Sequence, residues 1–147
     1  MNTVKDILAE KGKQVWTVEP KTTLLETLKT LRSHNVGALL VVESGHVKGI
    51  ISERDFAYRI AEKSACPLDE SVVTWMTKEV IAVSPATSIN ECMQLMSREH
   101  IRHLPVVDEG NLVGLISIGD VVRAVISGQQ STILGLENYI LSQRLTN

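Results

Sequence analysis

The chain has 147 residues, 44% of them apolar and 3% aromatic, and its formal net charge is −2 at pH 7. This length corresponds to about one domain, which buries roughly 68–70% of the surface of its unfolded chain. The charge excludes the strongly basic field that attracts nucleic acid. The sequence has no apolar run long enough to span a membrane and no signal-like N-terminus, so we expect a cytoplasmic protein without a membrane segment.

An internal repeat is the strongest pattern in the sequence. Residues 15–55 align without a gap with residues 80–120, and 13 of these 41 pairs are identical. Each copy of such a repeat is one structural unit, and the copies pack through equivalent faces. We therefore divide the chain into repeat one with its leading helix (1–65), repeat two (66–127) and a C-terminal amphipathic helix or tail (128–147).

Each copy predicts the order strand, helix, strand, strand, helix, which is an α/β (α+β) fold. Short strands at 16–18 and 81–83 stop before Pro20 and Pro85. The longer strands include continuous apolar runs, which are typical of strands covered on both faces. These longer strands are expected at 38–42 and 47–51 in copy one, and at 104–107 and 112–116 in copy two.

Apolar residues at helical spacing predict one helix after the short strand and another after the last strand of each copy. We expect the hydroxyls of Thr22 and Thr87 to cap the first of these helices. Residues 6–8 align with 74–76, so each copy is also expected to own a short leading helix. The residues of the last helices that should face inward are Phe56, Ile60, Val121, Val125 and Ile126.

The tail predicts a separate amphipathic helix. After Gly128, residues 131–143 place Ile133, Leu136 and Ile140 on one stripe. Two interpretations stay open at this point: the helix docks on its own module, or it contacts a second copy of the chain.

One short motif occurs in both copies and has the features of a site. Residues 49–55 and 114–120 both read glycine, two aliphatic residues, serine, two variable residues and aspartate. The serine lies where a strand ends and the aspartate about one helical turn later, at a helix N-terminus that attracts phosphate. A carboxylate there can accept hydrogen bonds from the two hydroxyls of a ribose. The alternative is a capping box, which needs no ligand.

The repeat and its motifs resemble a tandem pair of cystathionine-β-synthase (CBS) domains, also called a Bateman module, over residues 1–127. Segments 4–8, 49–56 and 101–108 are close to the family's patterns. The chain is similar to small stand-alone CBS-pair proteins of bacteria and of plant organelles. The resemblance implies two repeats related by a pseudo-twofold axis, with two clefts between them that bind adenine nucleotides as regulators.

The resemblance also implies roles for individual residues. Asp55 and Asp120 would hold ribose hydroxyls, and Ser52 and Ser117 would contact phosphates. The adenine slots would be lined by Thr17, Val18, Ala38, Leu39, Ala82, Val83, His103 and Leu104. Arg102 and His103 would point at phosphate, although they could instead be one exposed and one buried residue at the start of a strand.

The two clefts are expected to differ chemically. Copy one has Gly37 and Ala38 where copy two has Arg102 and His103. Copy one also has Arg54, where copy two has a glycine. Unequal affinities, or different ligands in the two clefts, should follow.

These observations predict a regulatory protein without catalysis that binds AMP, ADP, ATP or NAD(H), with S-adenosylmethionine ranked after them. We expect no catalytic cofactor, no metal site and no catalytic residues, because no activated nucleophile, Walker loop or Rossmann fingerprint can be placed. The expected partners are a second copy, in a disk of four repeats, and an unknown protein target regulated in trans. The alternative is a constitutive interaction scaffold with vestigial clefts.

Overall fold

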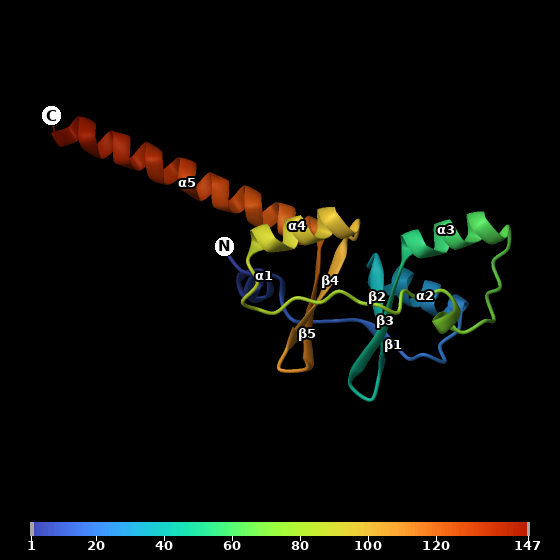
Figure 1. Ribbon diagram of the computed structural model, residues 1–147. Helices are drawn as coiled ribbons and strands as arrows, with labels where there is room; N and C mark the ends of the chain where they lie inside the picture. The colour runs from blue at the N-terminus through green and yellow to red at the C-terminus, as the bar shows by residue number, and fades with distance from the viewer. Residues whose placement is uncertain (1, 147) are drawn as a thin grey trace.

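The computed structural model describes residues 2–146 and contains both repeats (Figure 1). Repeat one consists of β1 (Thr17–Val18), α2 (Leu24–His34), β2 (Ala38–Glu43), β3 (His46–Ser52) and α3 (Glu53–Lys63). Repeat two consists of α4 (Ile89–Glu99), β4 (His103–Asp108), β5 (Asn111–Ser117) and α5 (Ile118–Thr146). The predicted mixture of helices and strands, with its order of elements, is confirmed except for the first strand of repeat two.

The two sheets differ in their first strand. In repeat one, β1 pairs in parallel with β2, which pairs antiparallel with β3. In repeat two, β4 and β5 form an antiparallel pair, and the strand expected at 81–83 is reduced to an isolated parallel bridge between Val83 and Val106. The residue next to that bridge is Pro105, which has no N–H to donate to a neighbouring strand. The proline therefore explains why the ladder stops after one bridge.

The helices that follow the short strands begin one residue later than the sequence predicts. Thr23 and Ser88 are their N-caps, and each forms a capping box with the glutamate three residues further on. The expectation that Thr22 and Thr87 cap these helices is wrong. Their hydroxyls instead accept hydrogen bonds from the backbone N–H groups of Glu19 (3.2 Å) and Ser84 (3.0 Å), in the turns that precede the helices.

The leading segments of the two repeats are exchanged. Helix α1 (Val4–Lys11) buries Val4, Ile7 and Leu8 in the hydrophobic core of repeat two. The second leading segment is a short 3₁₀ turn, η1 (Val72–Thr74), which packs with Trp75 and Met76 into the core of repeat one. Figure 1 shows the chain crossing between the two halves after α1 and again after η1. Each repeat is thus completed by a segment that the sequence assigned to the other.

The glycine of each motif makes room for this exchange. A Cβ atom on Gly49 would lie 2.5 Å from Met76 Sδ and 2.8 Å from the Thr77 carbonyl oxygen. A Cβ atom on Gly114 would lie 2.7 Å from a methyl carbon of Leu8. Both glycines therefore allow the leading segment of the opposite repeat to approach a strand closely.

The tail is not a separate helix. Helix α5 is continuous from Ile118 to Thr146 and projects away from the two repeats (Figure 1). Gly128 does not interrupt it, since a glycine costs a helix only about 1 kcal/mol. Of the residues expected to face inward, Phe56 and Val121 are buried, whereas Ile60 and Ile126 are exposed.

Candidate functional site

A cleft of about 500 Å³ lies between the two repeats. This volume is in the range of small-molecule sites. Residues of β3, α3, the segment before α4 and the segment that joins α4 to β4 line it. The lining residues are Gly37, Ile50, Ser52, Glu53, Arg54, Asp55, Tyr58, Thr77, Glu79, Val80, Ile81, His100, Ile101, Arg102 and His103.

Ser52 and Asp55 line the cleft at the junction of β3 and α3. The Ser52 backbone N–H and hydroxyl donate to Asp55 Oδ2 at 2.8 and 3.1 Å, and the Asp55 backbone N–H donates to Ser52 Oγ at 3.3 Å. This is the capping box that the sequence allowed, and it coexists with the cleft. Both of these hydrogen bonds to the carboxylate end on Oδ2, and Oδ1 can accept from a ligand hydroxyl.

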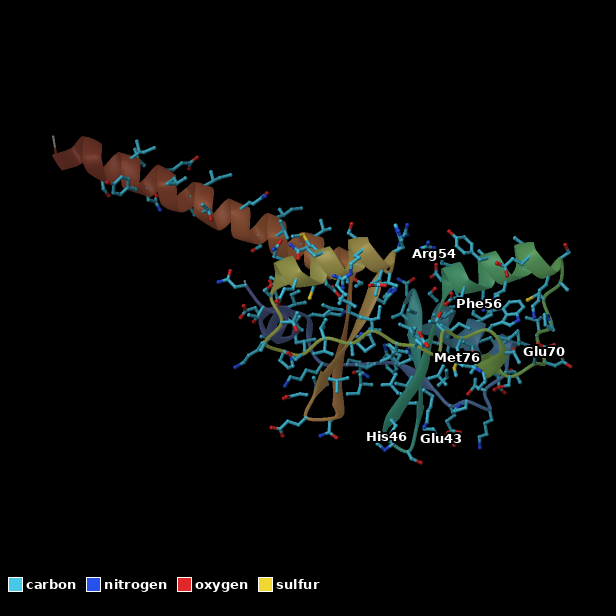
Figure 2. The ribbon with its side chains drawn as sticks, viewed as in Figure 1. Glu43, His46, Arg54, Phe56, Glu70 and Met76 are labelled. Carbon is cyan, nitrogen blue, oxygen red and sulfur yellow. The ribbon has the colours of Figure 1, made fainter. Side chains whose placement is uncertain are left out.

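The fold brings Arg54 and Arg102 to one cleft, although they belong to different repeats. Arg54 lies at the start of α3 on the side that faces α4 (Figure 2), and its Nη1 is 3.5 Å from the His100 carbonyl oxygen. Its guanidinium also lies 5.1 Å from the centre of the Tyr58 ring. Arg102 lines the same cleft from the start of β4. Two guanidinium groups that face one cleft are suited to bind phosphate.

His103 lines this cleft beside Arg102, and its imidazole approaches Gly37 of the other repeat. Burial lowers the pKa of His103, and the positive charges of Lys11 and Arg102 lower it further, against the opposing effects of Asp120 and Glu53. The side chain is therefore mainly neutral at pH 7. It can offer one hydrogen-bond donor and one acceptor to a ligand instead of a positive charge.

The segment from Thr77 to Ile81 contributes lining residues that the sequence analysis missed. Thr77 pairs with Ile50 of β3 through two backbone hydrogen bonds of 2.8 and 3.0 Å, which hold the segment at the edge of the cleft. Glu79 adds a carboxylate, and Val80 and Ile81 add apolar surface. The sequence pointed to this segment only through the alignment of the two leading segments. That alignment does not show that each leading segment packs on the opposite repeat.

Several residues assigned to the adenine slots do not line the cleft. Val18, Ala38, Leu39, Val83 and Leu104 are buried, and most of them belong to the two hydrophobic cores. Thr17 and Ala82 lie outside the lining residues as well. In the described cleft the apolar surface comes instead from Ile50, Tyr58, Val80, Ile81 and Ile101.

The second motif, Ser117 with Asp120, has a different environment. Lys11 Nζ lies 2.6 Å from Asp120 Oδ2 and donates to the Leu115 carbonyl oxygen at 2.7 Å. Arg123 Nη2 lies 2.7 Å from Asp120 Oδ1, so both carboxylate oxygens are paired with cations. Burial raises the pKa of Asp120, but the hydrogen bonds from Lys11 and Ser117 outweigh it, and the net pKa lies below its ordinary value.

The two leading segments bring opposite charges to the two motifs. Leu8 contacts Gly114 and Met76 contacts Gly49, so these two residues are structural equivalents. Helix α1 continues from Leu8 to Lys11, whereas the chain after Met76 is no longer helical and pairs with β3 through Thr77 before it reaches Glu79. A cation therefore neutralises Asp120, whereas an anion lines the cleft that contains Asp55. The two motifs therefore differ in charge, but not through the residues that the sequence analysis named, since Arg54, Arg102 and His103 line a single cleft.

Two β-α-β-β-α repeats with exchanged leading segments and a cleft between them define a tandem-repeat module. The CBS domain family model matches residues 4–62 and 70–127, and the chain belongs to this family. It is 36% identical over 148 residues to the mitochondrial CBS domain-containing protein CBSX3 of Arabidopsis thaliana, covering 94% of this chain and 71% of the relative.

Solved structures show the same fold. The CBS-domain containing protein ATU1752 of Agrobacterium tumefaciens superposes with a TM-score of 0.80 at 41% identity, over 83% of this chain and 98% of that one. The CBS domain pair of the protein MJ0100, in complex with 5′-methylthioadenosine and S-adenosyl-L-methionine, superposes with a TM-score of 0.74 at 29% identity, over 86% and 97%. Within residues 2–146, no helix has the length and apolarity to cross a membrane.

Proposed function

We propose that this protein is a regulatory module that binds an adenine nucleotide in the cleft between its repeats and acts on a protein partner in trans. The observation that carries the proposal is the meeting of Ser52 and Asp55 from repeat one with Arg102 and His103 from repeat two. A ligand held by both sets would favour one arrangement of the two repeats, and the partner would read the changed surface.

The chemistry of the cleft matches the parts of a nucleotide. The Asp55 carboxylate accepts hydrogen bonds from ribose hydroxyls, and Arg54 and Arg102 bind phosphate. The aliphatic side chains of Ile50, Val80 and Ile101 cover the base. The complex of MJ0100 with two adenosine-containing ligands supports this ligand class. The proposed ligands are AMP, ADP, ATP and NAD(H), with S-adenosylmethionine ranked after them.

The alternative function, a constitutive scaffold with vestigial clefts, is favoured by one observation. Ser52 and Asp55 complete a capping box by themselves, as Ser117 and Asp120 do at the other motif. A chain that uses these residues only as caps would need no nucleotide to fold or to bind a partner.

Thermal unfolding with each of the five ligands separates the two functions. A ligand at 100 times its Kd stabilises the folded state by about 2.7 kcal/mol, which raises the Tm of a domain of this size by about 5–10 °C. Adenosine and inorganic phosphate serve as controls that carry only part of the ligand. If none of the five ligands raises the Tm by more than about one degree at millimolar concentration, the scaffold is the better explanation.

A further inference from the structure

Helix α5 carries an exposed apolar seam along its length. The positions of the seam follow one another at alternating steps of four and three residues, and every one of them except Gln129 is aliphatic. The exposed fractions of the aliphatic members are 47%, 48%, 56%, 58% and 52% for Val122, Ile126, Ile133, Leu136 and Ile140. Nothing described in the chain covers this seam.

The seam adjoins the face of α5 that holds the helix to its repeat, and its Gln129 and Ile133 line a shallow groove with Met93 of α4. Val121 and Ala124 are buried in the core of repeat two, where α5 packs against α4, β5 and α1. Val122 and Ile126 follow them on the flank of the same turns and are exposed. The seam therefore starts beside the repeat and continues onto the projecting half of the helix, with the polar Gln129 between its aliphatic residues.

The projecting half needs a partner for its stability. Figure 1 shows it ending away from every other element. It contains Gly128 and Gly135, and each glycine costs a helix about 1 kcal/mol relative to alanine. Helices of this kind obtain most of their stability from packing an apolar face and little from intrinsic propensity. A face that is covered by nothing in the chain must gain that packing from another molecule.

The spacing of the seam residues indicates the kind of partner helix that α5 would bind. An apolar repeat with a mean spacing of 3.5 residues is the sequence of a left-handed coiled coil, and β-branched residues at the first core position with leucine at the second favour two strands. The first positions are Ile126, Ile133 and Ile140, which all fit this rule, whereas of the second positions Val122, Gln129 and Leu136 only Leu136 is a leucine. The seam is about 27 Å long from Val122 to Ile140.

We propose that α5 forms a two-stranded coiled coil with α5 of a second copy of this chain. The seam is self-complementary, because a copy offers the same spacing and the same side chains about a twofold axis. The proposal does not depend on nucleotide binding. It is also separate from the expected disk of four repeats, which would use faces of the repeats themselves.

The test compares two double variants of the full chain by light scattering after size-exclusion chromatography. Ile133→Glu with Ile140→Glu places like charges in the seam. Leu134→Glu with Leu141→Glu makes the same change one residue later, at side chains that are equally exposed (57% and 55%) but lie beside the seam. We expect the seam variant to have half the mass of the wild type and the control to keep the wild-type mass.

Three results would overturn the proposal: a monomeric wild type at micromolar concentration, a seam variant that keeps the wild-type mass, or a control that is halved as well. A seam variant that keeps the wild-type mass would mean that the chain self-associates through its repeats. A monomeric wild type would mean that the seam binds a different protein. Circular dichroism checks that both variants stay folded. An uncharged seam variant, Ile133→Ser with Ile140→Ser, should also dissociate, but only at a lower protein concentration than the charged one.

Discussion

The Lys11 ammonium lies 2.6 Å from the Asp120 carboxylate, although 109 positions separate the two residues in the chain. Asp120 holds the position where the resemblance to the CBS family places a ribose-binding carboxylate, and only 7% of its side chain is exposed. Arg123 pairs with its other oxygen. Lys11 and Arg123 thus form ion pairs with the carboxylate of the second motif, while Asp55 of the first motif faces an open cleft.

We expect one nucleotide to bind per chain, in the cleft with Asp55. Lys11→Met keeps the apolar stem and removes the ammonium, which should allow a second and weaker binding step. Isothermal titration calorimetry measures the number of sites. Lys13→Met, at an exposed position two residues further on, is the matched control and should keep a single site. Two equal and independent sites in the wild type would contradict the asymmetry between the motifs.

Alanine substitution should mainly weaken nucleotide binding at Asp55 and mainly lower the unfolding free energy at Asp120. Asp55→Ala removes a proposed ligand contact, so we expect about 10- to 150-fold weaker nucleotide binding and a loss of about 1 kcal/mol from the capping box. Asp120→Ala leaves Lys11 and Arg123 without their shared partner, so we expect a loss of about 1.5–3 kcal/mol in unfolding free energy. Calorimetry and urea unfolding measure the two effects. A stability loss with unchanged affinity in both variants would mean that both aspartates act only as caps.

Arg102→Ala should weaken a nucleoside mono- or diphosphate far more than adenosine, because the guanidinium would bind phosphate and not the base. The affinity ratio between AMP and adenosine is the measurement, and it removes effects on the base pocket. Arg98→Ala on α4 is the control, since Arg98 pairs with Glu99 and does not line the cleft. An equal weakening of both ligands by Arg102→Ala would indicate lost packing, and no change would place Arg102 outside the phosphate site.

The Asp120 carboxylate should make stability depend on acidity below about pH 4. Its pKa in the folded chain is lowered, so its contribution is complete above the unfolded pKa of about 3.9 and is lost as the pH falls through the folded pKa. The wild type should therefore keep its advantage over Asp120→Asn above about pH 4 and lose it progressively in the range below about pH 4. Urea unfolding of both proteins at several pH values tests this. A constant difference across that range would show that the ion pair does not stabilise the fold.

The sequence could predict only those site residues whose positions follow from local patterns. The positions of Ser52 and Asp55 follow from a strand that ends at a capping box, and both signals lie within a few residues. The meeting of Arg54 with Arg102 could not be predicted, since it depends on how one repeat packs against the other. The adenine-slot residues were placed by resemblance, and the structure puts four of the eight in the two hydrophobic cores.

Sequence alone determined the duplicated order of elements, because hydrophobic periodicity, caps and turns act over short distances and are repeated at equal spacing in both copies. Tertiary structure decided which repeat each leading segment completes, since that choice depends on which core has room for it: Leu8 fits against Gly114, and Met76 fits against Gly49. This exchange delivers Lys11 to Asp120 and Glu79 to the cleft with Asp55. Two nearly identical motifs thereby acquire different charges, through contacts between residues far apart in the chain.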